Sequence, residues 1–193
     1  QSGSSGFTWI VDPIDGTVNY LYGVPGWCVS IAVKNEERVI AGAVYSPSIS
    51  KMWSAADGSG AECNGESIRC NEPINLTSAL IGTGFAYDLK SREAQGNFFN
   101  NLIPKIRDIR RIGACAVDIC LVASGVLDAY YEAGVYEWDF AAAGLIARES
   151  GAKTLVAPGV PSDAQFFVMV AGPSLYAELG DELIQDGRWI SRI

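Results

Sequence analysis

WIVDPIDGTVNY, residues 9–20, is the stretch of the sequence that decides the fold. The apolar run Phe7–Val11 predicts a buried, central strand, which delivers Asp12 at its end. Pro13 has no backbone N–H, so the strand ladder is expected to stop there. Asp15 and the pair Gly16-Thr17 then predict the entry to a helical turn. The stretch therefore predicts a strand that feeds two carboxylates into a helix start.

The two aspartates are three residues apart across this bend, so both can point at one locus. Carboxylates, the carbonyl of Ile14 and water are the oxygen ligands that Mg²⁺ prefers. The N–H groups of Gly16 and Thr17 would suit a phosphate. The alternative is an ordinary turn, in which Asp caps and Gly supplies a positive φ. Taken alone, the Asp12-to-Gly16 pattern favours that turn.

A second candidate is Trp138-Asp-Phe-Ala-Ala-Ala-Gly144, at a predicted junction between a strand and a helix. Asp139 alone is most simply an N-cap residue. The functional interpretation is a carboxylate at a helix start that completes a metal site. The run of small residues would then let the helix pack closely beneath that site. Both aspartate motifs follow strand ends, where α/β folds place ligand sites.

Three other positions carry weaker signals. Glu132 is most simply a solvated glutamate at a strand end. The pair Arg110-Arg111 could attract a phosphate, although a surface pair is commoner. Cys115 has no neighbouring cation in sequence, which favours a buried, inert thiol over a nucleophile.

Composition excludes several kinds of chemistry. The 193 residues include 14 Lys+Arg, 22 Asp+Glu and no His, with a net charge of −8. The absence of His excludes Ser-His-Asp triads, Cys-His dyads and His metal ligands. The acidic balance argues against nucleic acid or an anionic membrane as partner. Five cysteines without a Cys-x-x-Cys pair indicate reduced thiols and a cytoplasmic protein.

The chain is expected to have two parts. Residues 1–75 predict a β-rich lobe with the first metal and phosphate motif, and residues 76–193 an α/β lobe with the second. The polar stretch 71–76 is the candidate boundary. Residues 1–6 predict a flexible linker or loop. A central strand at 7–11 needs neighbours, so we expect a missing N-terminal segment.

The predicted elements follow from apolar patterning and turn residues. The predicted strands span 27–33, 39–46, 51–55, 79–83, 109–112, 129–132, 154–156 and 166–171. The predicted helices span 91–103, 115–124, 140–149 and 174–184.

Together these motifs make the chain resemble the inositol monophosphatase family. Residues 9–20 are similar to its first signature and residues 138–144 to its second. The stretch 120–134, CLVASGVLDAYYEAG, is a third match. The resemblance covers essentially the whole chain. It implies a mixed α/β fold, layered as an α-β-α-β-α sandwich.

The resemblance also implies a site. Asp12, the Ile14 carbonyl, Asp15 and Asp139 match metal ligands for two or three Mg²⁺ ions, with Mn²⁺ possible, and Asp12 would bridge two of them. Gly16 and Thr17 match phosphate contacts, and Thr17 would also orient the attacking water. Glu132 matches a position that binds substrate hydroxyls, and the backbone of Ala114 and Cys115 lies in the same substrate pocket. The implied protein is a homodimer inhibited by Li⁺.

The implied reaction hydrolyses a small phosphorylated polyol, most simply myo-inositol 1-phosphate, by a metal-activated water. The same scaffold serves histidinol phosphate, fructose 1,6-bisphosphate and 3′-phosphoadenosine nucleotides, and a non-catalytic regulatory protein is a further alternative. Two departures stand out. A metal-ligand Glu and a mobile loop of the family precede residue 1. The family's Gly-Ser-Ala reads Gly113-Ala114-Cys115 here, which leaves the substrate open.

Overall fold

A computed structural model describes residues 6–87, 89–158 and 165–185. Each of the two halves of the chain forms one sheet. The first sheet contains β1 (Thr8–Asp15), β2 (Cys28–Lys34), β3 (Val39–Ser46), β4 (Lys51–Ala56), β5 (Ala61–Cys63) and β6 (Glu66–Ser67). The second contains β7 (Leu80–Thr83), β8 (Asp108–Arg110), β9 (Ala129–Val135), β10 (Lys153–Pro158) and β11 (Phe166–Ala171). The segment 68–79 connects the two sheets.

Five helices accompany the sheets in the part of the chain that the structure describes. They are α1 (Thr17–Tyr22), α2 (Leu89–Leu102), α3 (Cys115–Ala123), α4 (Glu137–Glu149) and α5 (Pro173–Gln185). Short 3₁₀ turns occupy Pro47–Ile49, Leu76–Ser78 and Ile103–Lys105. None of the described helices is long and apolar enough to cross a membrane.

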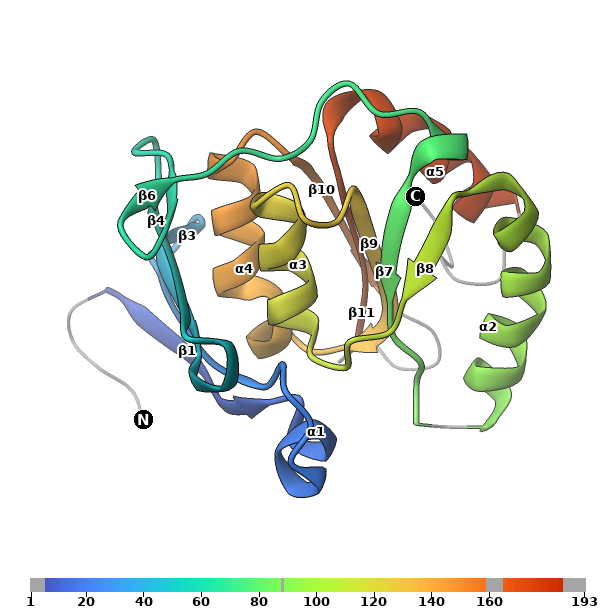
Figure 1. Cartoon of the computed structure of the whole chain (residues 1–193). Helices are drawn as coiled ribbons and strands as arrows, with labels where there is room; N and C mark the ends of the chain where they lie inside the picture. Colours follow the sequence, from blue (N-terminus) through green and yellow to red (C-terminus); the bar gives the residue numbers. More distant parts are fainter. Residues whose placement is uncertain (1–5, 88, 159–164, 186–193) are drawn as a thin grey trace.

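The sheets and helices alternate as layers (Figure 1). The first sheet is antiparallel in the order β1-β2-β3-β4-β5-β6, and the second has the order β10-β11-β9-β7-β8, with β7 parallel to both neighbours. Helices α3 and α4 lie between the sheets, while α2 and α5 cover the far face of the second (Figure 1). The predicted mixed α/β class and layered alternation are confirmed, and the described residues form a β-α-β-α stack.

The core has two parts, one on each face of the second sheet. The larger part joins α3 and α4 to the inner face of the first sheet and includes Trp53, Ile119, Ile146 and Val168. The smaller part joins α2 and α5 to the second sheet and includes Phe98, Leu175 and Met169. The strand β9 separates them, because side chains alternate between its two faces.

The first sheet packs closely against α4. A Cβ at Gly42 on β3 would lie 2.9 Å from the Cα of Ala142. The small residues of α4 therefore let backbone meet backbone, as the predicted close packing requires. This contact holds the helix that carries Asp139 directly against the sheet that carries Asp12.

The prediction of a buried central strand at Phe7–Val11 is wrong. Among the described residues β1 is an edge strand, paired only with β2, and Trp9 is 68% exposed. An edge strand with an uncovered outer face leaves every second side chain in solvent. The ladder is interrupted at Pro13, as predicted, but it resumes where Asp15 pairs with Cys28. The result is a β-bulge over residues 12–15.

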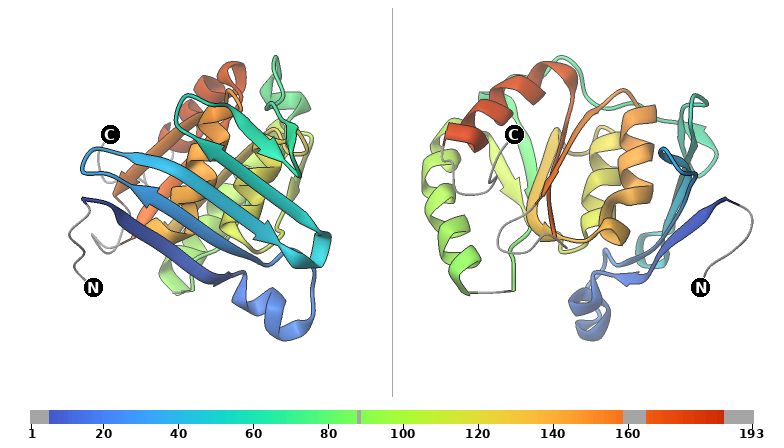
Figure 2. Two further views of the ribbon diagram at one scale, coloured as in Figure 1. Left: turned by 90° about the vertical axis from the view of Figure 1, so that its left-hand side faces the viewer. Right: turned by 180° about the vertical axis from the view of Figure 1, so that it is seen from behind.

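The outer face of the first sheet carries apolar side chains. Figure 2 (left) shows this sheet with no described helix in front of it. Cross-strand register places Val11 beside Ile31 and Ile31 beside Ala43. Other exposed apolar residues on this sheet include Trp9, Tyr45 and Met52.

Candidate metal and substrate site

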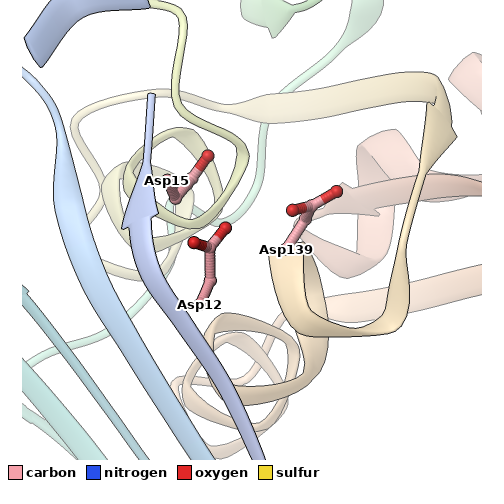
Figure 3. A group of neighbouring side chains, drawn as sticks. All are labelled: Asp12, Asp15 and Asp139. Carbon is pink, nitrogen blue, oxygen red and sulfur yellow. The ribbon is translucent and has the colours of Figure 1, made fainter. Parts of the chain in front are cut away.

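Three carboxyl groups converge where the two aspartate motifs meet. Oxygen atoms of Asp12, Asp15 and Asp139 lie within 4.8 Å of one another. Figure 3 shows them around one space, two from the end of β1 and one from the first turn of α4. The stretch 9–20 and the stretch 138–144, far apart in sequence, therefore form one site.

The bulge in β1 aims the first two carboxylates. Asp12 Oδ1 accepts a hydrogen bond from the Ile14 amide at 2.9 Å, so the side chain folds over its own turn. The Thr17 hydroxyl donates to the Ile14 carbonyl oxygen at 2.9 Å. Gly16, between them, has a φ of +79°, a conformation that glycine adopts without strain. Local hydrogen bonds thus place Ile14 and Thr17 beside the carboxylates.

Asp15 is tied to the helix layer. Its Oδ2 accepts a hydrogen bond from the Ala116 amide at 2.7 Å, in the first turn of α3. The Cys28 thiol lies 3.7 Å from the same oxygen. Asp15 is 8% exposed, so its carboxyl group is held by α3 rather than by water. This long-range bond joins the first motif to the Gly113-Ala114-Cys115 segment.

Asp139 is the third residue of α4 rather than its N-cap, which is Tyr136. Its Oδ2 accepts a hydrogen bond from the Tyr136 amide at 2.7 Å. The ring of Tyr136 stacks on Trp138 with centroids 4.6 Å apart. The N-terminus of the helix is thus closed by Asp139 itself, as the sequence partly anticipated, while the carboxyl group still faces Asp12.

The cluster is electrostatically crowded. Burial raises the pKa of Asp15 to about 8, with further contributions from Asp139 and Asp12. Burial likewise raises the pKa of Asp139 to about 7, again with a contribution from Asp12. Buried carboxylates favour the neutral form unless an opposite charge compensates them. Three hard oxygen donors that repel one another fit a divalent cation, and the Ile14 carbonyl lies in the same lining.

A cavity of about 580 Å³ opens beside the carboxylates. It is lined by all of the predicted site residues except Ala114: Asp12, Ile14, Asp15, Gly16, Thr17, Cys115, Glu132 and Asp139. Ala114 is buried under Gly16, whose added Cβ would lie 2.9 Å from the Ala114 Cβ. Glycine at position 16 therefore lets the turn after β1 pack closely against Ala114.

Glu132 faces this cavity and is not a solvated strand-end residue. Burial raises the pKa of its carboxyl group, while the Tyr130 hydroxyl and Arg111 act in the opposite direction. The Tyr130 hydroxyl donates a hydrogen bond to Glu132 Oε2. The carboxylate also occupies space that a side chain at Gly84 would fill. Cys115, 6% exposed, keeps its proton because burial raises the pKa of its thiol.

The basic pair Arg110-Arg111, for which the sequence favoured a surface position, divides between the two alternatives, and other lining residues were missed. Arg111 lines the cavity, whereas Arg110 pairs with Asp108 at 2.6 Å on the surface. Gly84, Tyr136 and Gln165 also line it. The basic pair was a usable signal for Arg111, because one of two adjacent residues on an extended segment faces inward. Gly84 and Gln165 had no local signal.

Comparison with known proteins agrees with this geometry. A sequence profile described as "Inositol monophosphatase family" matches residues 1–186. Inositol-1-monophosphatase SuhB of Mycobacterium tuberculosis is 44% identical over 176 residues, which cover 89% of this chain and 61% of that protein. Nus factor SuhB of Pasteurella multocida is 39% identical over 148 residues, covering 76% and 55%. The chain thus spans about three fifths of the length of the first of these relatives.

Solved structures share the fold as well. The structure titled "Mycobacterium tuberculosis SuhB" superimposes with a TM-score of 0.88 at 42% sequence identity. The match covers 96% of this chain and 75% of that one.

Proposed function

Because the chain belongs to the inositol monophosphatase family, we propose that the protein containing it is a metal-dependent phosphate monoester hydrolase. The proposed substrate is a small phosphorylated polyol, most simply myo-inositol 1-phosphate. The observation that carries the proposal is the cluster of Asp12, Asp15 and Asp139 at one end of a cavity that has Glu132 in its lining. That cavity offers a metal site and a hydroxyl-binding carboxylate together.

The cations of the proposal are Mg²⁺ ions, held by Asp12, Asp15, Asp139 and the Ile14 carbonyl. When bound, such ions lower the pKa of water and stabilise charge on a phosphate and its leaving group. The need for them follows from the lining itself. Among the described lining residues four side chains are carboxylic acids and one, Arg111, is basic. A phosphate dianion would be repelled unless cations invert this field.

The chain's own residues would then position the substrate. The amides of Gly16 and Thr17, both in the cavity lining, are proposed to contact the phosphate. The Thr17 hydroxyl, now bonded to the Ile14 carbonyl, would orient the water. Glu132 would accept a hydrogen bond from a substrate hydroxyl, and the backbone at Ala114 and Cys115 would border the polyol.

Phosphate release by the full-length protein tests the proposal. We expect Mg²⁺-dependent release from myo-inositol 1-phosphate, inhibited by Li⁺, and a lower kcat/KM with histidinol phosphate. A preference for histidinol phosphate, fructose 1,6-bisphosphate or a 3′-phosphoadenosine nucleotide would move the substrate and keep the chemistry. Absence of release from all four, with no metal binding, would favour a non-catalytic regulatory protein and overturn the proposal.

Assembly is a further part of the proposal. Family resemblance leads us to propose a homodimer, to be measured by light scattering on the full-length protein. A monomer that retains full activity would contradict it.

A further inference from the structure

Tyr130 lies behind the cavity, in contact with the acid that lines it. Its side chain is fully buried, and its hydroxyl donates to Glu132 Oε2. Tyr130 does not line the cavity, whereas Glu132 does. The hydroxyl therefore connects to the cavity through the Glu132 carboxylate, to which it donates.

Two other elements complete the surroundings of that carboxylate. Gly84, just after β7, leaves the space that the carboxylate occupies, because an added Cβ there would overlap it. The Cys115 thiol, from the start of α3, lies beside the buried Tyr130 hydroxyl. The hydroxyl has one proton, and the hydrogen bond to Glu132 Oε2 uses it.

We propose that Tyr130 is a positioning residue for polyol recognition, which holds Glu132 Oε2 so that Oε1 is presented to a substrate hydroxyl. The inference rests on the proposed function, in which Glu132 accepts a hydrogen bond from the polyol. It adds a residue outside the cavity that influences how well a hydroxylated ligand binds, because a hydrogen-bond partner behind a binding group fixes the orientation of that group.

Adjacent Tyr131 supplies a matched control. Its side chain is also buried on β9 but faces the opposite core, where it packs edge-on against Phe98 with centroids 5.8 Å apart. The Thr83 hydroxyl donates to the backbone carbonyl oxygen of Tyr131 at 2.9 Å, and the Tyr131 ring lies on the opposite face of β9 from Glu132. Tyr130→Phe and Tyr131→Phe each remove one buried hydroxyl from the same strand. Only the Tyr130 hydroxyl is bonded to a residue that lines the cavity.

The test compares both variants with wild type in the full-length protein. For Tyr130→Phe we expect KM for myo-inositol 1-phosphate to rise about tenfold with kcat nearly unchanged, because the lost contact serves ground state and transition state alike. Calorimetry with Mg²⁺ present measures the affinities for the two products, myo-inositol and inorganic phosphate, and we expect only one of the two to change. Affinity for myo-inositol should fall about tenfold, while affinity for inorganic phosphate should stay unchanged. Tyr131→Phe should alter none of these values.

Several outcomes would overturn the inference. These are a Tyr130→Phe variant with wild-type KM and myo-inositol affinity, equal losses for myo-inositol and phosphate, or equal effects of both variants. If wild type releases no phosphate from any ester, the proposed function fails, and myo-inositol binding still decides the inference: no binding by wild type overturns it. Should Tyr130→Phe not fold, Glu132→Asp, whose shorter side chain withdraws the carboxylate from the Tyr130 hydroxyl, must weaken myo-inositol binding in the same direction, and an unchanged affinity would count against the proposal.

Discussion

Asp12 is the residue on which the proposed activity most depends. It stands at the start of the β1 bulge and belongs to the carboxylate cluster. Asp12→Asn keeps the size of the side chain and an oxygen for the Ile14 amide, so the fold should persist. We expect turnover to be abolished, because an amide is a poor ligand for a hard cation. Phosphate release and a thermal melt of the same sample measure the two effects.

Asp57→Asn is the matched control for that substitution. Asp57 pairs with Arg38 at 2.8 Å on the surface, where ion pairs contribute little. It should retain full activity. An Asp12→Asn enzyme with near-normal turnover would remove Asp12 from the mechanism.

Asp15 predicts how the metal-free protein responds to pH. Its pKa is about 8 when folded and 3.8 as a free side chain, so the folded state retains a proton that the unfolded chain loses. The stabilising contribution of that proton is complete below pH 3.8 and is lost as the pH rises toward 8. The free energy of unfolding in EDTA should therefore fall between pH 5 and 8. The fall should be smaller in Asp15→Asn, which cannot ionise.

Denaturant titrations at pH 5 and pH 8 measure this difference. Added Mg²⁺ should restore stability at pH 8 in wild type, because the cation favours the ionised carboxylate, and should have less effect in Asp15→Asn. Identical pH dependence in the two proteins would show that Asp15 is not the group responsible.

At this scale the local signals succeeded where one residue and its neighbours determine the outcome. Asp12 and Asp15 follow a strand, and Asp139 opens a helix, so the sequence placed each at an element end. Gly84 could not be found this way, because its role arises from the parallel pairing of β7 with β9, and a contact between distant segments leaves no pattern in either one. Tyr130 and Glu132 are two residues apart on one strand, a spacing that puts them on the same face, but the sequence does not show what covers that face.

Helix α4 meets the first sheet at a position where volume is limited. A Cβ at Gly42 would lie 2.9 Å from the Cα and 3.0 Å from the carbonyl oxygen of Ala142. Both are backbone atoms, so a layer must shift. We expect Gly42→Ala to destabilise the protein by about 1–3 kcal/mol, and to lower metal affinity because α4 carries Asp139. Chemical denaturation and metal titration measure the two effects.

Gly144→Ala, in the same helix, is the opposite case. An added Cβ there would meet only the end of the flexible Arg148 side chain, at 3.6 Å. Alanine also favours the helical backbone by about 0.5–1 kcal/mol. This variant should be as stable as wild type or more so. Equal losses in both variants would show that the close contact at Gly42 is not the cause.

The edge strand β1 was the least predictable element. The pattern at Phe7–Val11 is apolar throughout, which is typical of a strand covered on both faces, yet Trp9 and Val11 are exposed. Hydropathy reports what a side chain prefers and not what covers it. By contrast, β11 (Phe166–Ala171) was predicted with its bounds, because its cover comes from both cores.

Across the whole molecule, the proposed metal site combines residues from both halves of the chain. A cation bound by Asp12, Asp15 and Asp139 would bind only the folded state. At 100 times its dissociation constant it would stabilise by about 2.7 kcal/mol. For a protein of this size that corresponds to a rise in Tm of roughly 5–10 °C. Differential scanning fluorimetry with and without Mg²⁺ measures it, and Asp139→Asn should lose most of the shift.

A loss of the shift must be separated from a loss of folding. Asp57→Asn should shift with Mg²⁺ as wild type does, because its carboxylate lies on the surface in an ion pair with Arg38. An equal Mg²⁺ response in Asp139→Asn and wild type would place the ion elsewhere.

The layered class was predictable for the whole molecule, because a β-rich half followed by alternating strands and helices has few packing solutions. The full order of strands in each sheet was not predictable, since it depends on which distant strands pair. The division into lobes at residues 71–76 remains a prediction. The larger core lies between the two sheets and includes Trp53 of the first and Val168 of the second.

The split of the site between two halves of the chain has a consequence for its assembly. Asp12 and Asp15 precede the connection at residues 71–76, and Asp139 follows it. Neither half alone possesses all three oxygen donors, so neither half should retain the ion. Were the two halves produced as separate fragments, Mg²⁺ would link them, and the strength of their association would depend on its concentration. Binding of the ion would then depend on the two sheets having come together.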